Sequence, residues 1–436
     1  QSATVPLDSP AQSLPARLGE VLLIVMVFFI LAGQPTPHVN EPHYLARLKH
    51  YWDPSWCPGD LFLESPEAHF VFAWSLGWLT KWLSLPALAW LGRTLGWNLL
   101  AWGWERLSWG VVPAPLAAVL SAALWVTFTR YAHLAGEWVV GGIEAKCFAY
   151  VFVLVALRDL IDGRWNRVWL ALGAASAFHA LVGGWSVVVC GGIWLAEQWM
   201  GAVPPRRIFQ SAVTMLPGLV AGGLIALAGV LPALALTWNE SPDVVAEANR
   251  IYVFERLPHH LALLAQPAHD LIFRLTRHGT LIAALFALLW IHRRVAPTPN
   301  AGLRIVTWYA YGAMLLAAIG FAIELAFWND PLRAASLLRY YWFRLTDVAV
   351  PLAVAMHSVA IITTGLAARR PWAPWALAAA LAIACGSIGH AVDDHVRNPV
   401  PPSDRQMRNY VAWLDACDWV AANTPPDALF LTPRRA

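Results

Sequence analysis

Long apolar runs recur along this chain at intervals that predict membrane-crossing helices. Hydrophobic residues make up 58% of its 436 residues and charged residues 13%, roughly half of the ~25% usual in soluble domains. A soluble protein this poor in polar groups could not cover its surface, so we expect an all-α polytopic membrane protein. The predicted spans number about eleven and lie near residues 18–33, 85–105, 113–131, 143–158, 166–182, 184–200, 208–236, 279–292, 303–328, 340–366 and 372–391.

The charges of the connecting segments predict an orientation for these spans. Short turns at 158–167, 204–207, 292–294 and 369–370 are basic, and with eleven spans all of them lie on the side of the N-terminus. Basic loops stay in the cytoplasm, which places the N-terminus inside and the C-terminus outside. We therefore expect a disordered N-terminus over 1–17, a transmembrane domain over 18–392 and an outer tail over 393–436. The near-neutral net charge of +3 argues against a nucleic-acid partner.

The first outer loop, residues 34–83, is far longer than a helix connection needs, and long loops tend to be functional. It opens with Asn40, Glu41, Pro42, His43 and Tyr44 and continues into predicted amphipathic helices, the second of which, near 68–83, suits the membrane interface. Glu41 stands at the membrane surface near the start of a helix. Two interpretations remain open for this carboxylate: helix capping with solvation, or chemistry on a substrate.

Two further outer segments place polar side chains in apolar surroundings. Glu144 and Lys146 enter an apolar run, where charges are costly and face either a cavity or a partner, including each other. Arg256 precedes the vicinal pair His259 and His260, which is suited to binding an anion or a metal or to moving a proton. No third ligand stands at zinc-site spacing, so the sequence predicts no metal residue and leaves a divalent cation unsupported.

The fourth outer segment leads into the tenth predicted span. Arg339 lies at its outer mouth, where a guanidinium can meet an anionic ligand. Arg344 and Asp347 are three residues apart, a spacing that favours a buried ion pair on one helix face. His179, in an apolar hairpin, is interpreted as a packed histidine. The carboxylate, the histidines and the arginines are thus all expected on the outer side. A lipid substrate there would have its apolar tail in the membrane and its phosphorylated headgroup beside these residues.

These features resemble the GT-C class of membrane glycosyltransferases, in which one long span precedes a large outer loop that opens with an acidic residue. The class transfers sugar from a polyprenyl phosphate or diphosphate at the outer face, and its first-loop acid deprotonates or orients the acceptor. The resemblance therefore implies a catalytic role for Glu41. It implies substrate binding by the remaining candidates: Asn40, His43, Tyr44, Glu144, Lys146, Arg256, His259, His260, Arg339 and Arg344. Residue 40 is Asn where many transferases carry a second acid, which leaves metal dependence open.

The segments FHALVGGW, FERLPHHL, YYWFRLTD and WLDACDWVAANTPPDALFLTPR are also similar to a poorly characterised family of large bacterial membrane proteins. That similarity implies a bacterial inner-membrane location. In the tail we expect an amphipathic helix over 407–424 and a strand over 427–433 that begins a soluble outer domain. Two other functions stay open: a transporter of a lipid-linked or anionic solute, and a non-catalytic subunit that binds lipid or a protein partner through faces rich in its 26 tryptophans.

Overall fold

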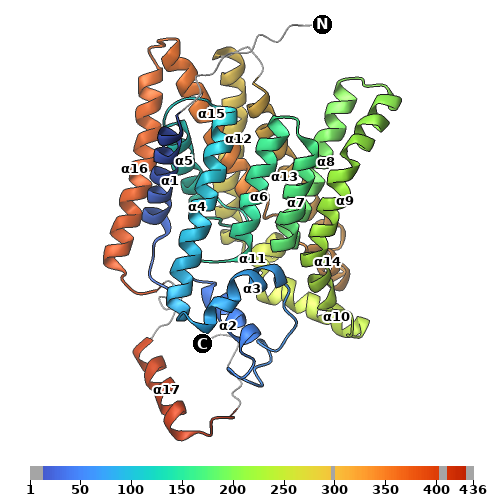
Figure 1. The fold of residues 1–436 in the computed structure, drawn as a ribbon, viewed down its shortest axis with the longest axis vertical. Coiled ribbons are helices and arrows are strands. Elements are labelled where there is room, and N and C mark those ends of the chain that lie inside the picture. The colour runs from blue at the N-terminus through green and yellow to red at the C-terminus, as the bar shows by residue number, and fades with distance from the viewer. Residues whose placement is uncertain (1–12, 296–299, 402–409, 429–436) are drawn as a thin grey trace.

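The described residues form a bundle of long helices with short helices packed at one end (Figure 1). The computed structural model describes residues 13–295, 300–401 and 410–428. Each of the eleven predicted spans coincides with a helix: α1 (Leu14–Ala32), α4 (Leu85–Val111), α5 (Ala117–Tyr131), α6 (Ala145–Ile161), α7 (Trp165–Phe178), α8 (Ala180–Met200), α9 (Pro205–Ala235), α12 (Ala268–Val295), α13 (Ala301–Ala326), α15 (Thr346–Ala367) and α16 (Ala373–Arg397).

Seven of these helices are long and apolar enough to cross a membrane: α1, α8, α9, α12, α13, α15 and α16. The helices α5, α6 and α7 have 15, 17 and 14 residues, fewer than the ~20 that a perpendicular crossing needs. The helix α4 has 27 residues but holds Arg93, Glu105 and Arg106. The chain is therefore a multi-pass, all-helical membrane protein, with seven crossings supported by length and composition.

The end of the bundle opposite the N-terminus carries the long loops (Figure 1). The first loop folds into α2 (Glu41–Trp52), α3 (Phe70–Leu76) and the 3₁₀ turn η1 (Gly77–Lys81). Later connections supply α10 (Pro242–Arg250), the π-helical turn η2 (Ile251–Arg256), α11 (Pro258–Leu261), the 3₁₀ turn η3 (Leu263–Ala265) and α14 (Pro331–Leu338). The predicted first-loop helices are thus present, and they form a cap on this end.

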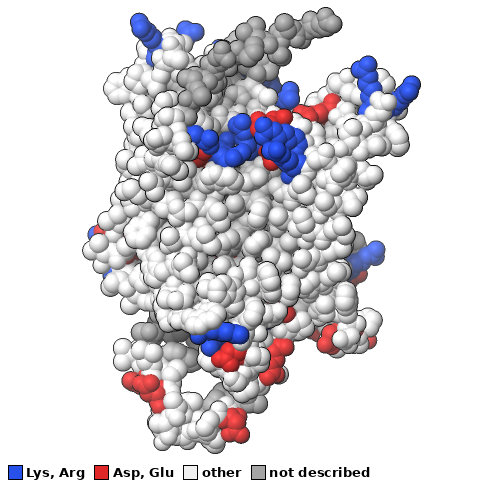
Figure 2. All heavy atoms as spheres, viewed as in Figure 1, with Lys and Arg blue, Asp and Glu red and all other residues white. Residues whose placement is uncertain are grey.

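Charged side chains divide between the two ends of the bundle. Figure 2 shows Lys and Arg gathered near the N-terminal end and mostly Asp and Glu at the opposite end, with few charges on the visible face between them. Helix α9 exposes apolar side chains along its length, among them Leu216, Leu224 and Leu231, which are 54%, 64% and 44% exposed. An apolar surface of this kind is what a helix bundle presents to lipid.

The interior is built around α15, most of which is buried. Trp104 and Trp125 stack with ring centroids 4.4 Å apart beside it, and both indoles are buried. Their ring nitrogens donate to the carbonyls of Ala118 and Val348, so each polar atom has a partner. Part of the tryptophan excess is therefore core packing.

The disorder predicted at the N-terminus ends earlier in the structure. Helix α1 begins at Leu14, so residues 14–17 are helical where we expected disorder. Ser13 caps this end through its hydroxyl oxygen, and Arg17 forms an ion pair with the buried Glu105 at 2.8 Å. In the tail, the expected helix is α17 (Tyr410–Asn423), whereas the expected strand at 427–433 falls largely outside the described residues.

Candidate functional site

Glu41 lies at the N-terminus of α2 and is fully buried. Its two carboxylate oxygens accept hydrogen bonds from Arg93 of α4 at 2.7 and 2.6 Å, and further bonds from the backbone N–H groups of His38 and Ile143. Burial by itself would raise the pKa of Glu41, but Arg93 and the two backbone donors outweigh it, so the pKa lies below its usual 4.5. Such a carboxylate joins three segments and is poorly placed to take a proton.

The segment at residues 132–144 joins α5 and α6 at the end of the bundle that carries the short helices, and its backbone is held by distant residues. The carboxylate of Asp347, at the start of α15, accepts hydrogen bonds from the N–H groups of Leu134, Ala135 and Glu137 at 2.5, 2.9 and 3.0 Å. His278 of α12 contacts the carbonyl of Ala132 at 2.9 Å. The prediction of an Arg344–Asp347 pair is therefore wrong, because Asp347 binds this backbone instead.

A buried chain of charges lies under that segment. Lys146 lies 3.1 Å from Glu144 and 3.6 Å from Glu137, and Arg344 lies 3.0 Å from Glu137. Asn40 donates to Glu144 at 2.8 Å. Two acids and two bases give no net charge, which is how a protein tolerates several ions away from water. Four residues predicted from three separate segments, Asn40, Glu144, Lys146 and Arg344, thus meet in one network around Glu137, which the sequence did not single out.

The remaining predicted residues surround this network without completing an open site. The imidazole of His260 contacts the carbonyl of Ala135, and its ring lies against Gly136, whose φ of +73° suits only a small residue. Arg339 binds Asn249 and Tyr340, not the network. The others lie as follows: Tyr44 packs on His69 and Phe72, His259 stacks near His260, and His43 contacts the ring of Phe62.

Partial burial together with the charge of Arg256 lowers the pKa of His43, which places Arg256 near the first loop. Burial and the charge of Arg344 lower the pKa of His260 to about 2. Both imidazoles are therefore neutral at physiological pH, and neither supplies positive charge for a phosphate. A neutral imidazole can still donate one N–H to an anion, so binding of an anion by these histidines stays a prediction.

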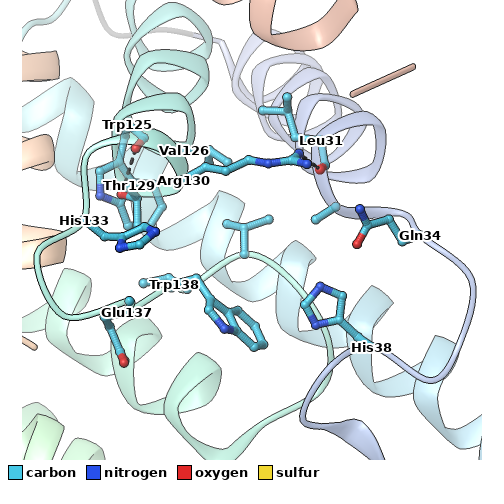
Figure 3. Close-up of a pocket in the computed structure, with 14 residues that line it drawn as sticks. Leu31, Gln34, His38, Trp125, Val126, Thr129, Arg130, His133, Glu137 and Trp138 are labelled. Carbon is cyan, nitrogen blue, oxygen red and sulfur yellow. Dashed lines mark hydrogen bonds between the residues drawn. The ribbon is translucent and has the colours of Figure 1, made fainter. Parts of the chain in front are cut away.

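A cavity of about 190 Å³ lies on the other side of the 132–144 segment, between α1 and α5 (Figure 3). Apolar side chains of both helices line it together with Gln34, Thr129 and Arg130. In Figure 3 the rings of His38, His133 and Trp138 surround the same space, while the carboxylate of Glu137 points away from Arg130. The cavity thus combines apolar walls with one guanidinium and two imidazoles.

The two histidines in this wall have buried ring nitrogens without a partner: the Nδ1 atoms of His38 and His133 make no hydrogen bond. Burial, aided by Arg93, lowers the pKa of His38 to about 4. Burial also lowers the pKa of His133, although the nearby charge of Asp347 opposes the shift. Buried polar atoms are normally paired, so two unpaired nitrogens at one cavity indicate space for a polar ligand.

Sequence reasoning singled out none of the cavity residues as site residues. Arg130 ends a predicted span, and His133 stands in the outer segment without a motif around it. The available signal was the occurrence of Arg130 and His133 around a span end, together with His38 three residues before Glu41. Among the described residues, no group of three His, Cys, Asp or Glu side chains could hold a metal ion.

The fold and this site define a multi-pass helical membrane protein with a largely apolar cavity that holds one arginine and two histidines. Residues 411–436, in the tail, match the family model of a domain of unknown function, DUF6798. No curated protein and no solved structure matches the chain.

Proposed function

We propose that the chain is a GT-C-like membrane glycosyltransferase that takes a sugar from a polyprenyl-phosphate donor at the outer face of a bacterial inner membrane. The observation that carries the proposal is the cavity between α1 and α5. It offers one cation, Arg130, and the unpaired Nδ1 atoms of His38 and His133, beside walls that are otherwise apolar. A sugar phosphodiester on a polyprenyl chain has one negative charge and an apolar tail, which fits this lining.

We further propose that all eleven of these helices cross the membrane. Eleven helices coincide with the predicted spans, and the four that are short or less apolar lie among the longer ones in chain order. Tilt or local thinning of the bilayer accommodates short spans at modest cost. Eleven crossings put the cavity, the capping helices and the tail on the outer side, where a lipid-linked donor made available to secreted acceptors is found.

The chemistry assigned to the cavity residues is a displacement at the anomeric carbon. The acceptor oxygen forms a bond to that carbon as the bond between carbon and phosphate oxygen breaks. The phosphate leaves with the electron pair and is held by Arg130, and the acceptor proton passes to Nδ1 of His133. Asp347, whose charge favours the protonated form of His133, stabilises the resulting imidazolium.

We assign the base to His133 and not to Glu41, because the oxygens of Glu41 are already occupied by Arg93 and two backbone donors. In this scheme Glu41 positions the first loop. The proposed resemblance to glycosyltransferases is then one of helix arrangement, and the proton acceptor is a histidine where the class uses a first-loop acid.

Binding of undecaprenyl phosphate in lipid nanodiscs tests the donor site. Replacing a charge-assisted contact to phosphate removes about 1.5–3 kcal/mol, so Arg130→Gln should weaken binding roughly 10- to 100-fold. Arg277→Gln, at the same end but not lining the cavity, is the matched control and should bind normally. Equal affinity for undecaprenol, or no effect of Arg130→Gln, would contradict a phosphate site here.

Transfer itself is measured as release of polyprenyl phosphate from a panel of polyprenyl-phosphate sugars. We expect His133→Gln to lower the rate by about 10²-fold or more, the usual contribution of a general base, with donor binding retained. His269→Gln, an exposed outer-end histidine, is the control and should leave the rate unchanged. Movement of intact donor across sealed vesicles without sugar transfer would instead establish a transporter, and co-purification of a stoichiometric protein without either activity would establish a subunit.

A further inference from the structure

Three tryptophans recur at four-residue intervals along the second half of the first loop. Trp74, Trp78 and Trp82, here named the tryptophan ladder, are 60%, 41% and 71% exposed. The rings of Trp78 and Trp82 contact each other edge to face, with centroids 5.4 Å apart. The opposite face of α3 is buried through Phe72 and Ala73. The segment is therefore two-sided, with one face packed on the protein and one face of indoles open.

The tryptophan ladder is followed along the chain by a helix with an exposed apolar stripe. Helix α4 begins at Leu85, directly after the ladder, and exposes Leu91, Leu95 and Leu99 by 46%, 42% and 36%. These leucines also recur every four residues, so they share one face of α4. Indoles at the end of an apolar stripe are typical of the boundary between hydrocarbon and headgroups.

We propose that the tryptophan ladder inserts into the outer leaflet at the level of the headgroups and fixes the height of the first loop on the membrane. The occupant of this face is the lipid surface. Two features favour lipid: the ladder leads into the exposed leucine stripe of α4, and the indole ring is apolar with a polar N–H, which Trp78 donates to the carbonyl of Ser75 at 2.9 Å. The exposed Lys81, whose ammonium group stacks on Trp52, adds attraction to anionic headgroups.

Contacts join the ladder rigidly to the outer-end site. The indole N–H of Trp52, on α2, donates to the carbonyl of Ala73 at 2.9 Å. Gly77 lets the same indole pack closely, since a Cβ there would lie 2.7 Å from its ring. The other end of α2 is fixed to α4 by Glu41 and Arg93. Membrane insertion of the ladder therefore sets the position of α2, and it does so whether or not the protein transfers sugar.

The depth of the ladder can be measured with a nitroxide spin label in nanodiscs of phosphatidylcholine and phosphatidylglycerol. The background replaces the exposed Cys57, Cys385 and Cys417 with serine, and leaves the buried Cys147 and Cys190. Labels are placed through Trp78→Cys and, as the control on the same loop, Leu61→Cys, a position that is 86% exposed. We expect the label at 78 to collide more with oxygen, which concentrates in lipid, and the label at 61 to collide more with a water-soluble nickel chelate.

Two results would overturn the proposal. Equal access of the nickel chelate to labels at 78 and 61 would place the ladder in water, and shielding of the label at 78 from both reagents would place it against a protein or a second copy of the chain. A second measurement avoids the label. Lipids brominated near the headgroup should quench the fluorescence of the native protein more than that of a variant carrying Trp74→Phe, Trp78→Phe and Trp82→Phe. Equal fractional quenching would contradict insertion.

Discussion

At the scale of single residues, this protein pairs the charges that it buries near the capped end of the bundle. Arg93 is 1% exposed and satisfies both oxygens of Glu41 while donating to the carbonyl of Gln34 at 2.5 Å. Gly142 makes this approach possible, because a Cβ there would lie 2.9 Å from a Glu41 oxygen. A buried charge that loses its partner is far more costly than the pair is stabilising.

Glu41→Gln should therefore destabilise the protein, by about 3–5 kcal/mol for loss of one partner of a buried pair. Thermal unfolding in detergent measures the effect, with the exposed Glu240→Gln as control. Because the pKa of Glu41 is lowered, its stabilisation is complete above its ordinary value of 4.5 and is lost as the pH falls through the lowered pKa. The variant should lack that acid-dependent loss. A variant of native stability that fails only in sugar transfer would instead restore Glu41 as a catalytic residue.

At the scale of elements, α7 and α9 pack backbone against backbone. A Cβ on Gly222 would lie 2.2 Å from the carbonyl oxygen of Trp169, and one on Gly173 would lie 2.2 Å from the carbonyl oxygen of Gly222. Glycine at such positions lets membrane helices approach closely enough for many dispersion contacts. The short helix α7 is thus held by its neighbour, which compensates for its limited length.

The adjacent glycines of α9 provide a test of this packing. Gly222→Ala should force the two helices apart and cost about 1–3 kcal/mol, the usual penalty of overpacking. Gly223→Ala is the matched control, since nothing lies within 4 Å of a Cβ at that position, and it should be neutral or slightly stabilising. The melting temperatures of the two variants measure this difference in stability. Equal values would show that α7 and α9 can move apart without loss of stability.

At the scale of the whole molecule, the two ends of the bundle differ in charge. The visible end near the N-terminus is rich in Lys and Arg and the opposite end in Asp and Glu (Figure 2). This asymmetry follows the rule that basic segments remain in the cytoplasm, and it supports the proposed orientation with the cavity and tail outside.

Labelling in intact cells tests that orientation. Cys57 in the first loop and Cys417 in α17 are both exposed, and both should react with a membrane-impermeant maleimide added outside. A cysteine introduced by Arg206→Cys, in the first turn of α9, should react only after permeabilisation. The reverse pattern would invert the topology and with it the proposed access of outer-leaflet donors.

The approximate helix positions follow from the sequence alone, because apolar runs of span length have few other stable structures in lipid. The sequence also identified Glu144, Lys146 and Arg344 as buried charges that need partners, since each stands in or beside an apolar run. Partner choice required the tertiary structure: Asp347 binds the 132–144 backbone, and Arg344 pairs with Glu137, 207 residues earlier in the chain. The cavity was equally hidden, because residues from α1, α5 and two loops form it only when the helices pack. The pattern of apolar and polar residues along the chain predicts which side chains are buried. Which buried groups pair depends on the segments that the fold brings within a few ångströms of each other.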